Sequence, residues 1–225
     1  MIKKSVVTVG TFDGVHKGHR LLISKVLSIA KKNNFKSIVI TLEHPVKKIS
    51  GLLTTFEEKL NEIKTLGVDE IAIIKVYSEI ISYSPDEFFD EILCKTFNVS
   101  EIVCGYNFSF GKDKKGNIKC LEKKAKSNGV KTSIVKPLKI TSEQVSSSRI
   151  RMLIKKGDIK NAAKLLGRSY SFTGIPFKEK GMGKRLGFPT VNLKVFSDKL
   201  LPRGVFVSFI SHGEKIYPSV TNIGT

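Results

Sequence analysis

Over its first 150 residues the chain alternates between short apolar runs and segments with helical spacing. The helical segments carry hydrophobic residues three and four positions apart, around residues 21–30, 56–66 and 85–93. The apolar runs are rich in Val and Ile, as buried strands are, and cover residues 5–10, 37–42, 71–76, 101–104 and 132–135. Strands that alternate with helices predict a parallel sheet with helices on both faces. Such sheets bind ligands beyond the carboxyl ends of their strands.

The pattern changes after about residue 150. Two short helices are predicted at residues 149–156 and 158–166. Beyond them, short apolar runs separated by Gly and Pro turns are typical of strands, at residues 170–174, 205–210 and 217–220. We therefore expect two domains, an α/β domain over residues 1–160 and an antiparallel domain of barrel or sandwich type over residues 165–225.

The formal net charge is +19, from 39 Lys and Arg against 20 Asp and Glu. It is uneven, since residues 51–100 carry 4 basic and 10 acidic side chains while the other segments are basic. A positive field of this size favours anionic partners, either nucleic acid or phosphorylated small molecules. A lysine-rich solvated surface explains the same charge equally well.

The sequence indicates a cytoplasmic protein without a membrane segment. No stretch approaches the roughly 18 consecutive apolar residues of a membrane span, and the apolar run near the start is too short for an export signal. The three cysteines, an odd number without CxxC spacing, are typical of reduced side chains. The sequence does not indicate an oligomeric state.

The first predicted strand ends in the glycine-rich stretch GTFDGVHKGH, residues 10–19. Glycines between a strand and a helix let the backbone approach a ligand, and the helix N-terminus favours an anion. His16 and His19 are two of only four histidines in the chain. Their N–H groups can stabilise phosphate oxygens that gain charge during displacement. A glycine-rich turn with exposed histidines is the alternative, which the pairing of the histidines disfavours.

This stretch resembles the H-x-G-H signature of the nucleotidyltransferase superfamily. More narrowly, it is similar to the adenylyltransferase half of bacterial bifunctional riboflavin kinase/FAD synthetases. The resemblance implies a Rossmann-like nucleotidyltransferase domain that binds ATP, with His16 and His19 on its phosphates. It implies that the residues lining the nucleotide site are Gly10, Thr11, Phe12, Asp13, Gly14 and Gly18.

Two further segments are similar to motifs of this family. The segment GYNFSFG, residues 105–111, resembles an element of the flavin site, which implies flavin contacts for Asn107 and Phe110; core packing of its aromatics is the alternative. The segment SSSRIR, residues 146–151, resembles a phosphate-binding helix start. That likeness assigns Ser147 and Ser148 to a phosphate and Arg151 to transition-state charge, whereas a simple serine cap is the alternative.

The segment TLEHP, residues 41–45, resembles a longer family motif and leaves His44 either at the site or structural. In the second domain, GMGKRLGFPTVN, residues 181–192, resembles the riboflavin kinase motif. The resemblance implies that Gly183 and Lys184 cover nucleotide phosphates, and that Thr190 and Asn192 hold Mg²⁺. The family's kinase domain continues past the NIG segment at 222–224 and has its catalytic glutamate there. We therefore expect a partial β-barrel without kinase activity.

The resemblance thus implies transfer of AMP from ATP to FMN, giving FAD and pyrophosphate, with Mg²⁺ accompanying ATP. The intact family member also phosphorylates riboflavin to FMN. One alternative is a nucleotidyltransferase that acts on another phosphorylated acceptor, such as a nicotinamide or pantetheine phosphate. A nucleic-acid-binding protein is the alternative from another class, and we expect neither nucleic-acid nor membrane partners, because the lysines cluster without aromatic side chains.

Residues 165–225 produced alone are expected to be unstable or to associate, because a barrel without its closing strands leaves open edges. Thermal unfolding followed by circular dichroism, with sedimentation for the oligomeric state, tests this expectation. A cooperative transition of a monomer would contradict it.

Overall fold

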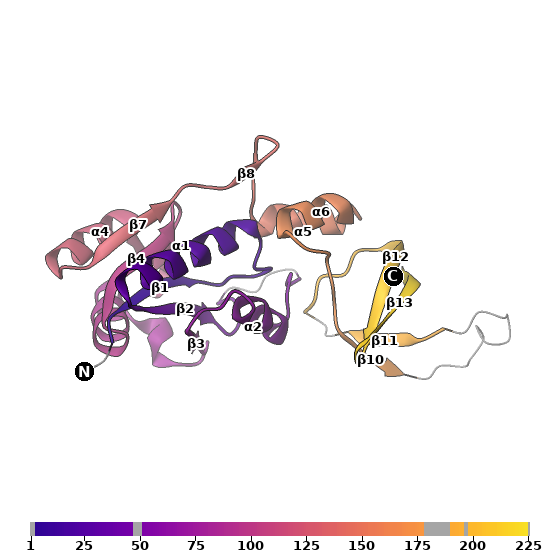
Figure 1. Cartoon of the computed structure of the whole chain (residues 1–225), viewed down its shortest axis with the longest axis horizontal. Helices are drawn as coiled ribbons and strands as arrows, with labels where there is room; N and C mark the ends of the chain where they lie inside the picture. The colour runs from indigo at the N-terminus through magenta and orange to yellow at the C-terminus, as the bar shows by residue number, and fades with distance from the viewer. Residues whose placement is uncertain (1–2, 47–50, 178–189, 196–197, 225) are drawn as a thin grey trace.

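A computed structural model of the whole chain describes residues 3–46, 51–177, 190–195 and 198–224 (Figure 1). Its centre is a five-stranded sheet in the order β3-β2-β1-β4-β7, in which every neighbouring pair is parallel. The strands are β1 (Ser5–Gly10), β2 (Lys36–Leu42), β3 (Glu70–Ile74), β4 (Val99–Gly105) and β7 (Lys131–Val135). The predicted parallel sheet is confirmed. Its strand order reverses next to β1, the place where open α/β sheets bind ligands.

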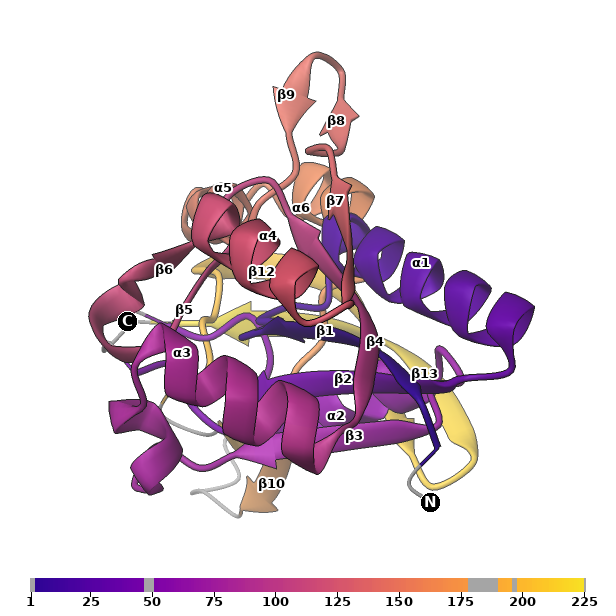
Figure 2. The ribbon, with the colours of Figure 1, turned by 90° about the vertical axis from the view of Figure 1, so that its left-hand side faces the viewer.

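Helices cover both faces of this sheet (Figure 2). One face carries α1 (Lys17–Asn33) and α2 (Phe56–Lys64), whose side chains pack on Val6, Val39 and Val103. The other face carries α4 (Ile118–Ser127) and a helix that starts as α3 (Pro85–Glu87) and continues as the π-helical η2 (Phe88–Thr96). Strand side chains point alternately to the two layers, which is why the strands are apolar throughout.

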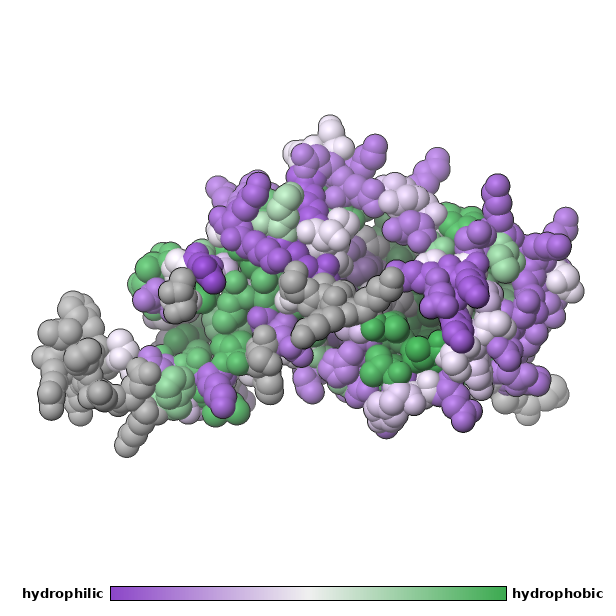
Figure 3. All heavy atoms as spheres, turned by 180° about the vertical axis from the view of Figure 1, so that it is seen from behind, coloured by the Kyte–Doolittle hydropathy of each residue, from purple (hydrophilic) through white to green (hydrophobic). Residues whose placement is uncertain are grey.

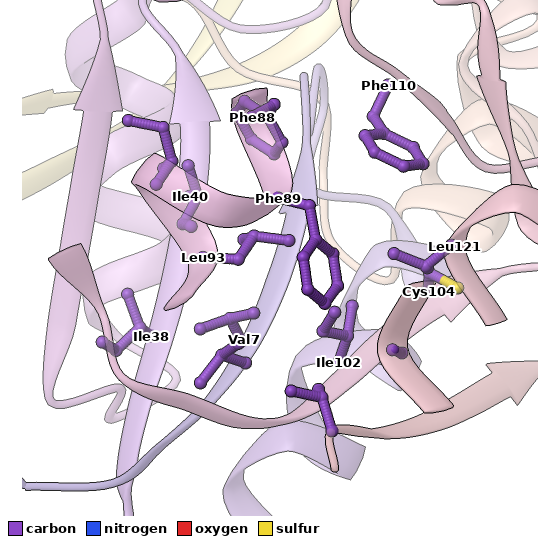
Figure 4. Close-up of a cluster of buried hydrophobic side chains, with 14 of the residues drawn as sticks. Val7, Ile38, Ile40, Phe88, Phe89, Leu93, Ile102, Cys104, Phe110 and Leu121 are labelled. Carbon is purple, nitrogen blue, oxygen red and sulfur yellow. The ribbon is translucent and has the colours of Figure 1, made fainter. Parts of the chain in front are cut away.

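The largest buried cluster lies between the sheet and the layer of η2 and α4 (Figure 4). Phe89 is fully buried there among side chains of the sheet, including Val7 and Ile102. Phe110 belongs to the same cluster. It comes from the short strand β5 (Ser109–Phe110), which pairs with β6 (Gly116–Asn117) beside the 3-10 turn η3 (Lys112–Lys114).

Small elements that the sequence did not predict connect the larger helices and strands. Helix η1 (Glu79–Ser82) is a single 3-10 turn, and β8 (Lys139–Ile140) pairs with β9 (Glu143–Gln144) as a small ribbon. Two helices follow, α5 (Ser147–Lys155) and α6 (Ile159–Leu166), close to the predicted positions. They bury Ile150, Ile154 and Leu166 against Leu53.

The last part of the chain is antiparallel, as expected, but its described residues form two separate two-stranded sheets instead of a closed barrel. Strand β10 (Gly174–Phe177) pairs with β11 (Asn192–Val195), and β12 (Gly204–His212) pairs with β13 (Lys215–Ile223). The strand expected at residues 170–174 begins only at Gly174, and the Tyr170 hydroxyl before it donates to the Leu200 carbonyl. Hydrophobic side chains gather on the surface of this end (Figure 3), and Val207 and Phe209 are 88% and 74% exposed.

Replacing Phe89 with Ala is expected to lower the free energy of unfolding by about 3–5 kcal/mol, because it empties a closed part of the core. Urea unfolding measures this loss. The control is Tyr77→Ala, which removes a ring that is 76% exposed and should change stability by about 0.5 kcal/mol or less. A loss for Phe89→Ala as small as that of the control would contradict the packing described.

Candidate active site

The glycine-rich loop lies between the end of β1 at Gly10 and the start of α1 at Lys17, beyond the carboxyl end of the central strand. Its backbone takes the left-handed conformation at Phe12, Gly14 and Val15. Two observations require glycine at position 14: its φ is +84°, and a Cβ there would come within 2.8 Å of Leu53. Phe12 and Val15 are buried, so packing holds two unfavourable conformations in place.

His16 and His19 are stacked, with ring centroids 3.6 Å apart and planes at 15°. His16 caps α1, because its Nδ1 accepts a hydrogen bond of 3.3 Å from the backbone N–H of His19. That bond leaves the proton of a neutral His16 on Nε2. Gly18 makes the stack compact, since a Cβ there would lie 3.1 Å from the His16 ring.

Burial is the main reason why both imidazoles are held neutral. The pKa of His16 falls from 6.5 to about 4, chiefly through burial; a backbone hydrogen bond opposes the shift, and the nearby cations of Arg168 and Arg151 add to it. Burial also holds the pKa of His19 well below its usual value, with His16 contributing. Nδ1 of His19 is buried and has no hydrogen-bond partner among the described residues. The pair therefore offers neutral ring N–H groups and unused polar capacity beside a helix N-terminus.

Asp13 is buried and connects the loop to the segment before α2. Its carboxylate accepts hydrogen bonds from the backbone N–H groups of Leu53, at 2.9 Å, and Thr54, at 3.1 Å. The Thr54 hydroxyl donates to Asp13 at 3.3 Å and accepts from the Gly14 N–H at 3.0 Å. Asp13 therefore holds the loop in place through hydrogen bonds to Leu53 and Thr54.

Arg151 and Ser147 come to the loop from α5. The Arg151 guanidinium pairs with Asp13 and donates through Nε to the Gly51 carbonyl at 3.0 Å. The Ser147 hydroxyl donates to the Asp13 carbonyl at 2.9 Å. Ser148 is exposed, and the α5 cap is Ser146. The structure thus brings Arg151 and Ser147 together with the histidine loop, more than 130 residues away in sequence.

The other predicted residues of the first domain are less closely grouped. Asn107 is exposed just past β4. Phe110 is 6% exposed and stacks on Phe108, with centroids 5.5 Å apart, so it packs in the core as the alternative interpretation holds. Thr11 is exposed on the loop, and His44 is exposed 6.3 Å from the Phe56 ring.

The predicted kinase residues lie in the second region. Gly183 and Lys184 fall outside the described residues. Thr190 is exposed, and Asn192 begins β11, where it pairs with Phe177. Across the part of the chain that the structure describes, no three His, Cys, Asp or Glu side chains are grouped to hold a metal ion.

Sequence reasoning missed two buried lysines near the loop, Lys59 and Lys199. Lys59 lines a small recess with Thr11, Asp13 and Phe56, and its Nζ donates to the Leu42 carbonyl at 2.5 Å. Burial lowers the pKa of Lys59 to about 8, although Asp13 and Glu43 oppose the shift. A lysine in an acidic, helical segment is usually solvated, and nothing in its spacing marks it as buried.

The sheet, the loop and the stacked histidines define a nucleotidyltransferase-like α/β protein. A family model described as FAD synthetase matches residues 1–149, and one described as riboflavin kinase matches residues 166–225. The chain belongs to the FAD synthetase family. No helix in the described ranges has the length and apolar character needed to cross a membrane.

Comparison with curated proteins and solved structures supports this family assignment. Proteins named bifunctional riboflavin kinase/FMN adenylyltransferase are 32% identical in Bacillus subtilis, over 98% of this chain and 72% of the relative. In Listeria monocytogenes the identity is 33%, over 93% and 69%. A solved Streptococcus pneumoniae structure described as a macrolide-efflux protein matches with a TM-score of 0.87 and 28% identity, over all of this chain and 75% of that one.

The stability of the protein is expected to fall as the pH drops from about 6.5 towards 4, because the unfolded chain then protonates His16 while the folded chain does not. His16→Asn keeps a capping side chain but removes this titration. Between pH 7 and 4.5 we expect the parent to lose about 2–3 kcal/mol more than this variant in urea unfolding. His212→Asn, at an exposed histidine, should behave as the parent; equal losses for all three proteins would contradict the burial of His16.

Proposed function

We propose that this chain transfers AMP from ATP to FMN, giving FAD and pyrophosphate. The observation that carries the proposal is the stacked pair of neutral histidines, His16 buried and His19 partly buried, at the start of α1 beyond the central strand. Family membership supports it, since relatives with about a third of their residues identical are named as FMN adenylyltransferases. Both reactants are phosphorylated, which suits the formal net charge of +19 of the chain.

In the proposed step an FMN phosphate oxygen attacks the α-phosphorus of ATP, and the bond to the bridging oxygen of pyrophosphate breaks. No residue is needed as a nucleophile. Nε2–H of His16 and a ring N–H of His19 donate to oxygens that gain charge, and their fixed, buried positions require no reorganisation. The free N–H groups of α1 and the glycine backbone bind the phosphates. Mg²⁺, bound with ATP, supplies charge neutralisation on the leaving pyrophosphate.

Other residues have proposed supporting roles. Arg151 contributes positive charge to the transition state from its place beside Asp13, and the start of α5 with Ser147 and Ser148 forms a second phosphate-binding end. Gly10–Gly14 with Gly18 line the nucleotide site. Asn107 contacts the flavin, and Phe110 supports that turn by core packing. We propose a cytoplasmic location, which the free thiols of Cys94, Cys104 and Cys120 suit.

Phosphorylation of riboflavin is a second candidate, favoured by the riboflavin kinase match over residues 166–225. It rests on the division into domains 1–160 and 165–225, with Gly183 and Lys184 at the nucleotide phosphates and Thr190 and Asn192 toward Mg²⁺. The sequence alone led us to expect no such activity. Incubation with riboflavin, ATP and Mg²⁺ decides between the two expectations by the appearance of FMN or of FAD formed from it.

With ATP, Mg²⁺ and FMN the protein is expected to form FAD, measured by chromatography. His19→Ala should lower kcat/KM by about 100- to 1000-fold, because it removes one preorganised donor from the transition state. His212→Ala is the control. A folded parent that makes no FAD would defeat the proposed function, and a fully active His19→Ala would defeat the mechanism.

The alternatives are tested separately. Nicotinamide and pantetheine phosphates are offered as acceptors in place of FMN, and binding of nucleic acid is measured at low salt.

A further inference from the structure

Lys199 is a buried lysine between β11 and β12, and it contacts the segment before α2 that binds the histidine loop. Its side chain is 1% exposed. Its Nζ donates to the Leu53 carbonyl at 2.8 Å, pairs with the Glu58 carboxylate at 2.5 Å and lies 4.8 Å from the centre of the Tyr170 ring. Of these partners, Leu53 precedes α2 and Glu58 lies in the first turn of that helix.

The backbone around Lys199 fixes the same segment. Residues 52 and 199 form a parallel bridge, in which the Leu52 N–H donates to the Asp198 carbonyl at 2.7 Å and the Leu200 N–H donates to the Leu52 carbonyl at 2.9 Å. Leu200 also packs so closely on Gly51 that a Cβ there would come within 2.9 Å. The residues flanking Lys199 thus fix residues 51–53 through backbone hydrogen bonds like those between neighbouring strands.

The opposite side of residues 51–54 faces the histidine loop. Leu53 and Thr54 donate their N–H groups to Asp13, Thr54 accepts from Gly14, and the Gly51 carbonyl accepts from Arg151. Residues 51–54 therefore form a layer between Lys199 and the loop. Leu53 is the shared element, since its carbonyl binds Lys199 and its N–H binds Asp13.

We propose that Lys199 is a positioning residue for adenylyl transfer, one that keeps the loop of residues 10–19 ready for ATP through Leu53 and Asp13 without touching a substrate. This inference rests on the proposed function of that loop. It assigns to a side chain of the second region a role in the chemistry of the first. Packing alone would need an apolar side chain here, whereas a buried ammonium between a carbonyl and a carboxylate fixes both of them in direction as well as distance.

The test compares Lys199→Met with Lys199→Arg in the full chain. Met keeps the length but removes the charge, and we expect it to raise the KM for ATP about 10- to 100-fold per folded molecule, because the loop is no longer held in its binding conformation. The KM for FMN should change less. Arg keeps the charge toward Glu58 and should recover most of the affinity. The control is Lys194→Met, at an exposed lysine of β11.

Lys199→Met leaves the Glu58 carboxylate without its cation, and one of its oxygens already has no partner among the described residues. If that variant does not fold, the double variant Lys199→Met/Glu58→Gln takes its place in the assay, because it no longer leaves an unpaired Glu58 carboxylate. A KM for ATP within twofold of the parent, or a loss explained entirely by fewer folded molecules, would overturn the proposal.

Hydrogen–deuterium exchange separates this inference from the proposed function. The backbone N–H groups of residues 10–19 should exchange faster in Lys199→Met than in the parent and in Lys194→Met. If the parent makes no FAD, the proposed function fails and exchange alone decides: faster exchange in the loop supports the positioning role of Lys199, and unchanged exchange refutes it.

Discussion

The buried carboxylate of Asp13 is the interaction on which the site depends. It accepts from two backbone N–H groups and pairs with Arg151, so it joins the loop after β1 to the segment before α2 and to α5. Breaking a buried pair of this kind typically costs about 3–5 kcal/mol, because a charge is left without a partner. The strained conformations of Phe12 and Val15 persist only while such contacts hold the loop.

The same loop sets the electrostatics of the histidines. Helix α1 needs a cap, and His16 supplies it with Nδ1, which fixes the ring and leaves Nε2 as its donor. His19 stacks on His16, and burial lowers the pKa of both rings and keeps them neutral. An incoming phosphate would change this balance, since an anion favours the protonated ring. Binding and charge are therefore linked at this site.

Much of the fold could be predicted from local pattern. The five apolar runs became the five parallel strands, and the helix expected around residues 21–30 became α1. Helix α4 was missed because its segment is lysine-rich, and only Leu121 and Ala125 are buried on it. The strand predicted at residues 170–174 was misplaced, since β10 starts at Gly174; the hydrogen bond from Tyr170 to Leu200 is a tertiary contact that no spacing reveals. Phe110 looked equally suited to a ligand or to the core, and burial assigned it to core packing in this structure.

The sequence by itself determined the sheet, the loop and the family, because each rests on neighbouring residues: strand and helix periods, glycines at a turn, and two histidines three positions apart. Only the tertiary structure decided the partners of Asp13, the burial that neutralises the histidines, and the docking of Lys199 on Leu53 and Glu58. These depend on desolvation and on contacts between segments that are 40 to 146 residues apart. Desolvation is a property of everything packed around a group, and it cannot be read from the residues beside that group in the chain.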